Sequence, residues 1–245
     1  MGQTPNKKPG KNISLKRPFI SLSGHEKASM KPNNSPVETR RTLYLATQNE
    51  HKVEEFQAML GSAWNVRSAN QLGLESGQKI SWNETGDSFV ANSRIKALAL
   101  RQITPSAVLA DDSGLVVDAL NGAPGIYSSR YAGSPEGTPR AAADAANTAK
   151  LLNDLQEVPD SKRTARFVCC LVFIDERGEE TVVEGYCEGR IAKSPSGHHG
   201  FGYDPVFFVP SHNRTMAELS EVEKNRLSHR AEAVTKLTRH WRPLA

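Results

Sequence analysis

The chain has 245 residues, of which 38% are hydrophobic and 24% are charged. This composition is sufficient for one substantial domain or for two small lobes around a packed core. No apolar run approaches the roughly 20 residues of a membrane helix, so we expect no membrane association. The formal net charge of +4 comes from the first 41 residues, which contain nine Lys and Arg and two acids and so carry +7. The remaining residues carry 4 − 7 = −3. We therefore expect no specific nucleic-acid partner for that remainder.

Residues 1–41 are rich in Lys, Pro, Asn and Ser and have no hydrophobic period. We predict a disordered basic tail there and one folded domain over 42–245. Organelle targeting, a weak tether to anionic surfaces and a translation start at Met30 stay open as alternatives for the tail. The chain has three cysteines without the spacing of a disulfide framework, which favours a reducing, cytoplasmic location.

The first part of the predicted domain alternates strands with helices. The pattern predicts strands at 42–47 and 64–68, helices at 50–60 and 88–103, and a loop at 69–87 whose last four residues cap the second helix. Thr47, Asn49 and Lys52 lie where the first strand enters the first helix, and a helix N-terminus with polar side chains suits a phosphate. A simple Asn cap is the equal alternative. Asn92 and Lys96 are four residues apart and share a helix face, which indicates either a second phosphate contact or a solvated face.

Asp111 and Asp112 lie between two apolar runs, 107–110 and 115–118. Burying a carboxylate without a partner is costly, so the pair needs a chemical reason. Neighbouring residues of an extended chain point to opposite sides, so only one of the two acids can face a cleft. We expect the other to hold the following turn or a neighbouring donor. Hard oxygen ligands of this kind favour Mg²⁺.

The second half of the chain adds a hairpin and two helical segments. The pattern predicts a helix at 138–156, paired strands at 165–174 and 180–191, a loop of Gly, Pro and aromatic residues at 195–205, and a helical segment at 215–241 with a capping box from Ser220 to Glu223. Strands interspersed with helices, together with a hairpin, predict an α/β fold with a mixed sheet. Acids for a metal, lysines for phosphate and an aromatic loop for a ring indicate a nucleotide.

Six stretches then make the chain similar to a known family. They are ATQNEHKVEEF (46–56), ETGDSFVANSRIKA (84–97), LADDSGLVVDALNGAPGIYSSRYAG (109–133), NTAKLL (147–152), GFGYDPVFF (200–208) and EKNRLSHRAEAV (223–234). In this order they resemble the inosine triphosphate pyrophosphatase family. The resemblance implies a homodimer with an elongated mixed sheet, flanking helices and two lobes around a central nucleotide cleft. It also implies Mg²⁺-dependent hydrolysis of ITP, dITP and XTP to the monophosphate and pyrophosphate, which keeps these nucleotides out of DNA and RNA.

The resemblance further implies roles for individual residues. Asp112 corresponds to the general base and metal-site residue, and Glu84 to a second metal-site acid. Direct coordination weakens a base, so we expect Asp112 to act on a water while Glu84 takes more of the ligation. His229 and Arg230 correspond to the residues that read the 6-keto edge of the purine. The complete implied substrate-binding set is Thr47, Gln48, Asn49, Glu50, His51, Lys52, Asn92, Lys96, Ser113, Phe201, Gly202, Tyr203, Asp204, Lys224, His229 and Arg230.

Two other functions stay open. A Maf-type pyrophosphatase would act on other nucleotides, and the complete GFGYDP and SHR stretches argue against it. A nucleotide or nucleic-acid binding module without activity would depend on the basic tail. Removal of residues 1–41 distinguishes these, because a hydrolase keeps its activity and a tail-dependent binder loses its salt-sensitive affinity.

Overall fold

The structure, a computed structural model, describes residues 40–241. The predicted tail lies outside the described residues except for its last two, and Arg41 is already the first residue of a strand, one position before the predicted start of the domain. No helix within 40–241 is long and apolar enough to cross a membrane.

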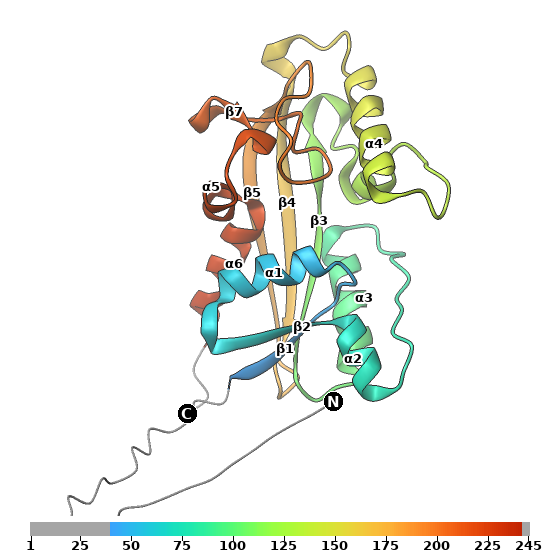
Figure 1. Cartoon of the computed structure of the whole chain (residues 1–245), viewed down its shortest axis with the longest axis vertical. Coiled ribbons are helices and arrows are strands. Elements are labelled where there is room, and N and C mark those ends of the chain that lie inside the picture. The colour runs from blue at the N-terminus through green and yellow to red at the C-terminus, as the bar shows by residue number, and fades with distance from the viewer. Residues whose placement is uncertain (1–39, 242–245) are drawn as a thin grey trace, which may run out of the picture. The chain divides into compact units, whose positions relative to one another are not determined.

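The described residues form a seven-stranded mixed sheet with helices on both faces (Figure 1), which confirms the predicted α/β fold. The strand order is β2-β1-β3-β4-β5-β6-β7; β1 is parallel to β2 and β3, and the remaining neighbours are antiparallel. The strands are β1 (Arg41–Leu45), β2 (Trp64–Ser68), β3 (Ala107–Val117), β4 (Thr164–Ile174), β5 (Glu180–Ile191), β6 (Phe207–Val209) and β7 (Arg214–Thr215). The helices are α1 (Glu50–Leu60), α2 (Ala69–Ser76), α3 (Phe89–Arg101), α4 (Arg140–Asp154), α5 (Glu221–Leu227) and α6 (His229–His240).

Three sequence predictions about elements were wrong. The expected loop after β2 begins with α2, which Ser68 caps through a reciprocal bond pair with Gln71. The cap of α3 is Ser88, whose Oγ accepts the Ala91 N–H, and not the segment 84–87. The C-terminal helical segment is broken at Ser228, because this residue ends α5 in an extended conformation and caps α6.

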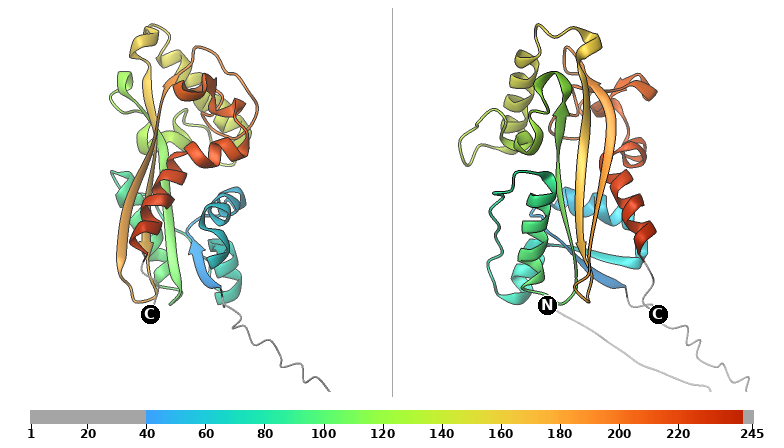
Figure 2. Two further views of the ribbon diagram at one scale, coloured as in Figure 1. Left: turned by 90° about the vertical axis from the view of Figure 1, so that its left-hand side faces the viewer. Right: turned by 180° about the vertical axis from the view of Figure 1, so that it is seen from behind.

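The hydrophobic core is divided along the long strands β3, β4 and β5, which Figure 2 shows running side by side. One cluster joins α1, α6 and β2 to one face of the sheet, and a second joins α2 and α3 to the opposite face. A third cluster lies at the other end of the same strands, beneath α4 and β6. This division agrees with the predicted two lobes.

The short strand β1 leaves part of β3 without a strand neighbour. β1 pairs with β3 only from Ala107 to Leu109, although β3 continues to Val117. β1 has β3 on one side and β2 on the other. The connection from β1 to β2 runs through α1 on one face of the sheet, and the connection from β2 back to β3 runs through α2 and α3 on the opposite face. The carboxyl end of a strand at such a switch point is where ligands bind in α/β folds. We call residues 110–114 the open edge of β3.

Candidate active site

Asp111 and Asp112 lie on the open edge of β3 and point to opposite faces of the sheet. Asp111 contacts α1 and α6, whereas Asp112 contacts α3. Only 4% and 9% of their surfaces are exposed. The expectation that neighbouring acids face opposite sides is therefore confirmed, and each acid has its own partners.

Asp111 is bound by two cations from distant parts of the chain. Lys52 in α1 donates to Asp111 Oδ2 at 2.8 Å, and Arg230 in α6 donates to the same oxygen at 3.2 Å. Ser113 donates to the other oxygen. Burial alone would raise the pKa of Asp111, but the charges of Lys52 and Arg230 bring it well below the usual value, so the carboxylate is ionised. Arg230 also donates to Glu55 in α1 at 3.3 Å.

Asp112 shares a buried lysine with Glu84. Lys96 Nζ lies 3.0 Å from Asp112 Oδ1 and 2.9 Å from Glu84 Oε1. Asn92 donates to Asp112 Oδ2 at 3.4 Å and accepts the Gly86 N–H at 2.9 Å. Asn92 and Lys96 are 0% and 4% exposed, so the alternative of a solvated helix face was wrong.

The ionisation of this second cluster follows from its burial. Burial raises the pKa of Asp112, although the charge of Lys96 acts in the opposite direction. Burial alone would lower the pKa of Lys96, but the charges of Asp112 and Glu84 raise it overall, so the ammonium keeps its proton. A carboxylate with a raised pKa beside a fixed cation is a common arrangement at catalytic sites.

The turn from β1 into α1 forms the predicted helix cap. Asn49 Oδ1 accepts the His51 N–H at 3.1 Å, and Thr47 Oγ1 accepts the Asn49 N–H at 3.1 Å. The first N–H groups of a helix remain available to an anion, so the cap and a phosphate site are compatible. The side chains of Gln48, Glu50 and His51 are exposed, and no contact within 40–241 joins them to the two aspartates.

The loop before β6 presents Phe201 to three cations. The charged groups of Lys224, Arg140 and Arg230 lie 5.0, 5.5 and 5.6 Å from the centre of its ring. Asp204 accepts from Lys224 at 2.7 Å and from the Phe201 N–H at 3.1 Å. Phe201 is therefore connected through Arg230 to Asp111 and Lys52.

Helix α4 supports this loop from the other side. Asp144 accepts the Gly202 N–H at 3.1 Å, and Thr148 donates to the Gly202 carbonyl at 3.4 Å. Tyr203 donates to the Ser128 carbonyl at 2.8 Å. The sequence predicted helix α4 but gave no signal for Asp144 and Thr148, because their partner Gly202 lies more than 50 positions away.

Glu55 is a residue that the sequence pattern could have identified. It lies three positions after Lys52 and therefore shares a helix face with it.

His229 is the first residue of α6 and is neutral. It is 7% exposed and stacks on Phe167 with ring centres 5.0 Å apart. Burial lowers the pKa of His229 well below the usual value. Its Nδ1 atom is buried without a hydrogen-bond partner among residues 40–241. A neutral imidazole carries one N–H donor and one acceptor.

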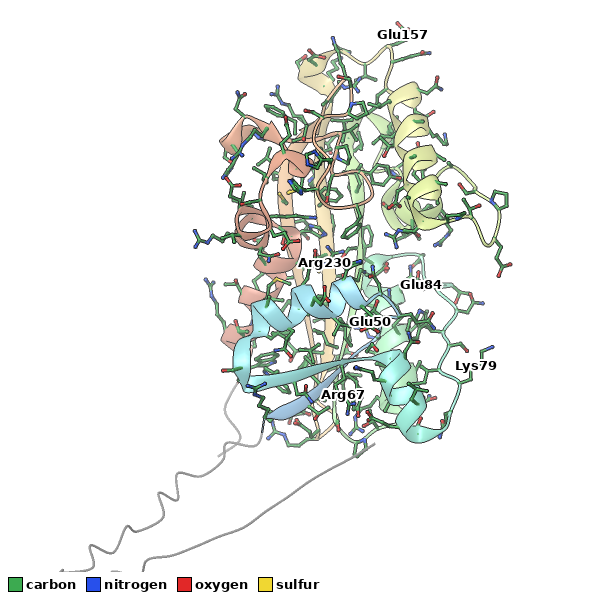
Figure 3. The ribbon with its side chains drawn as sticks, in the orientation of Figure 1. Glu50, Arg67, Lys79, Glu84, Glu157 and Arg230 are labelled. Carbon is green, nitrogen blue, oxygen red and sulfur yellow. The ribbon has the colours of Figure 1, made fainter. Side chains whose placement is uncertain are left out.

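Contacts thus join predicted site residues from α1, α3, β3, α5, α6 and the loop before β6, together with Glu84, but do not include Gln48, Glu50 and His51. Figure 3 labels Glu84 and Arg230 within this region. Comparison with known proteins identifies the family. The model of the Ham1 family matches residues 43–240. The chain belongs to the Ham1 family.

Named relatives of this Ham1-family chain have similar length. A dITP/XTP pyrophosphatase of Shouchella clausii is 48% identical over 196 residues, which are 80% of this chain and 93% of the relative. The protein of the same name from Pseudomonas syringae pv. tomato is 46% identical over 197 residues, which are 80% and 94% of the two chains. The structure of a HAM1 protein from Coxiella burnetii superposes with a TM-score of 0.70 at 39% identity and covers 81% of this chain and 97% of that one. The resemblance stated from the sequence motifs is thereby confirmed.

Proposed function

We propose that this Ham1-family chain hydrolyses deaminated purine nucleoside triphosphates, such as ITP, dITP and XTP, to the monophosphate and pyrophosphate. One continuous set of contacts carries the proposal: Phe201 approaches Arg230, Arg230 and Lys52 bind Asp111, and the neighbouring Asp112 binds Lys96. This set offers an aromatic ring for a base, cations for phosphates and carboxylates for chemistry. The names of the bacterial relatives support the same activity.

A divalent metal ion, which we propose to be Mg²⁺, suits the residues around Lys96. Carboxylate oxygens of Glu84 and Asp112 both lie within 3.0 Å of the Lys96 nitrogen, so two hard ligands already converge on a cation. No group of three or more His, Cys, Asp or Glu side chains within the described part of the chain could hold a metal alone. Mg²⁺ commonly takes further ligands from phosphates and water, so the two carboxylates would be sufficient protein ligands. Bound there, the ion would offset negative charge on the phosphate oxygens.

We propose that Asp112 acts as the general base for attack on the α-phosphorus. Its raised pKa makes the ionised form a better proton acceptor than an ordinary aspartate. Lys52 and Lys96 belong to clusters on opposite faces of the sheet, and both clusters meet at the open edge. Fixed cations on two sides of a triphosphate stabilise the charge that develops as pyrophosphate leaves.

We propose that discrimination against ATP comes from Arg230, which lies near Phe201, and from the neighbouring His229. The guanidinium of Arg230 is fixed by Asp111 and Glu55, and His229 supplies a neutral ring. Donors of this kind pair with a 6-keto oxygen but lose a partner opposite a 6-amino group. A site built to hydrogen-bond one group can reject its analogue by several kcal/mol.

Pyrophosphate release from ITP, XTP, dITP, GTP and ATP with Mg²⁺ tests the proposal directly. We expect kcat/KM for the deaminated purines to exceed that for ATP by at least about 100-fold, as loss of one well-formed polar contact allows. Equal rates on all purines, or preference for a pyrimidine, would favour a Maf-type enzyme. Binding without pyrophosphate release would favour the binding module.

Two finer properties extend the proposal. We propose a cytoplasmic location, which is supported by the three free, buried thiols of Cys169, Cys170 and Cys187. We also propose a homodimer, on the resemblance alone, and sedimentation of the purified chain tests it.

A further inference from the structure

Asp111 takes no part in the chemical step as proposed so far, yet it binds two residues of the proposed substrate site at once. Its side chain is 2% exposed, and its Oδ2 atom accepts from both Lys52 and Arg230. A buried carboxylate that only stabilised the fold would not need both partners to come from the substrate site.

The two partners serve opposite ends of the nucleotide under the proposed function. Lys52 follows the helix cap that suits the triphosphate, and Arg230 lies beside the Phe201 ring that suits the base. They also come from helices at opposite ends of the folded sequence, α1 and α6. One carboxylate oxygen therefore determines how far apart two distant cations lie.

We propose that Asp111 is a positioning residue that fixes Lys52 relative to Arg230, so that binding of the triphosphate and recognition of the base depend on each other. The inference rests on the proposed function. Without this negative charge, Lys52 has a flexible four-carbon stem and a side chain that is already 20% exposed, so its ammonium can turn into solvent. Arg230 keeps Glu55 but loses its buried partner, and the two cations repel each other.

The test compares Asp111→Asn with Asp175→Asn. Asp175 is a matched control because it is also buried, at 8% exposure, and also binds an arginine, Arg177 at 3.1 Å, but in the turn between β4 and β5. For Asp111→Asn we expect kcat/KM on ITP to fall about 10- to 100-fold, in line with the cost of misplaced binding groups. We expect the preference for ITP over ATP to fall at least about fivefold, and Asp175→Asn to change neither quantity.

A purely structural role predicts a different result. In that case Asp111→Asn would lower the melting temperature as Asp175→Asn does, while KM and the ITP-to-ATP ratio per folded molecule would equal those of the wild type. This outcome would overturn the proposal.

A double-mutant cycle covers the case in which Asp111→Asn does not fold. Lys52→Gln, Arg230→Gln and the double variant all retain Asp111, and a shared carboxylate predicts that their effects on kcat/KM are not additive. Additive effects would overturn the proposal.

Calorimetric binding of ITP without divalent ions separates this inference from the proposed function. A wild-type protein that binds ITP but releases no pyrophosphate after Mg²⁺ is added refutes the hydrolase, and the same cycle on affinity then tests Asp111. A wild-type protein that does not bind ITP in the absence of divalent ions, and releases no pyrophosphate from it with Mg²⁺, overturns both.

Discussion

Gly114 offers a direct test of how closely the residues around Asp112 must pack. It lies two positions after Asp112 in β3, so it faces the same side of the sheet. A β-carbon at Gly114 would lie 2.5 Å from the carbonyl oxygen of Gly125, 2.7 Å from Ser128 Oγ and 2.8 Å from Phe89 Cε1. Ordinary contact begins at 3.4 Å, so in Gly114→Ala the new β-carbon and the Gly125 carbonyl oxygen must move apart by 3.4 − 2.5 = 0.9 Å.

This separation has consequences for both stability and catalysis. The short helix Gly125–Arg130 must move away from β3, and the ring of Phe89, the first residue of α3, must turn or move by 3.4 − 2.8 = 0.6 Å. Overpacking costs about 1–3 kcal/mol, which corresponds to a decrease in Tm of about 3–10 °C for a domain of this size. Phe89 lies in the first turn of α3, which carries Asn92 and Lys96. A displacement of α3 by about half of the 1 Å that costs about 100-fold should lower kcat by about 10-fold.

The assay measures Tm and pyrophosphate release from ITP for Gly114→Ala and for a control, Gly73→Ala. The control adds a methyl group in α2, where the nearest atom, the Gln78 carbonyl oxygen, is 2.9 Å away and no site residue is involved. We expect the control to keep its kcat. A Gly114→Ala variant with lowered Tm but with kcat within threefold of the wild type would refute the reasoning.

Four further predictions follow from the site. Asp112→Asn should lower kcat by at least about 100-fold while ITP still binds, because the variant loses the base but keeps the cations; wild-type turnover would remove Asp112 from that role. Only the ionised Asp112 carboxylate accepts a proton, and burial raises its pKa. The rate should therefore decrease as the pH falls through a pKa above the usual aspartate value, and a pH profile with an ordinary aspartate midpoint would contradict this. Phe201→Ala should raise KM for ITP with little change in Tm; the reverse pattern would make the ring a packing residue. A chain without residues 1–39 should keep its pyrophosphatase activity. A salt-sensitive loss of nucleotide binding in this chain would instead favour the alternative of a binding module that depends on the tail.

Local signals in the sequence were sufficient for most of the fold. The residues of α1 and its Asn49 cap follow from helical spacing, and the β4–β5 hairpin follows from two long apolar runs around a polar turn. Helix α2 was missed because it is short and contains Gly73, and its stability comes from packing against the sheet. Weak local propensity is commonly overridden by such contacts.

The motifs were sufficient to name the candidate site residues, but not to predict which of their side chains contact each other. No local pattern connects Asp111 to Arg230, which lies 119 positions away, or places Lys96 between Glu84 and Asp112. The sequence argument expected Asp111 to hold a turn or a neighbouring donor, and the donors are Lys52 and Arg230, two residues of the proposed substrate site. These contacts depend on how β1 ends beside β3, which only the folded sheet defines.

The open edge of β3 also bears on self-association. A strand with unpaired backbone groups is a template for a strand of another molecule, and proteins prevent such pairing with charges and covering segments. Here Asp111 and Asp112 place two charges on the unpaired stretch, and Ser128 accepts the Leu115 N–H at 2.9 Å just beyond it. Because both acids are almost fully buried beside their cations, the side chains gathered at this stretch also cover its unpaired backbone. A variant that neutralises both acids loosens this cover, so it should precipitate more readily as well as lose activity.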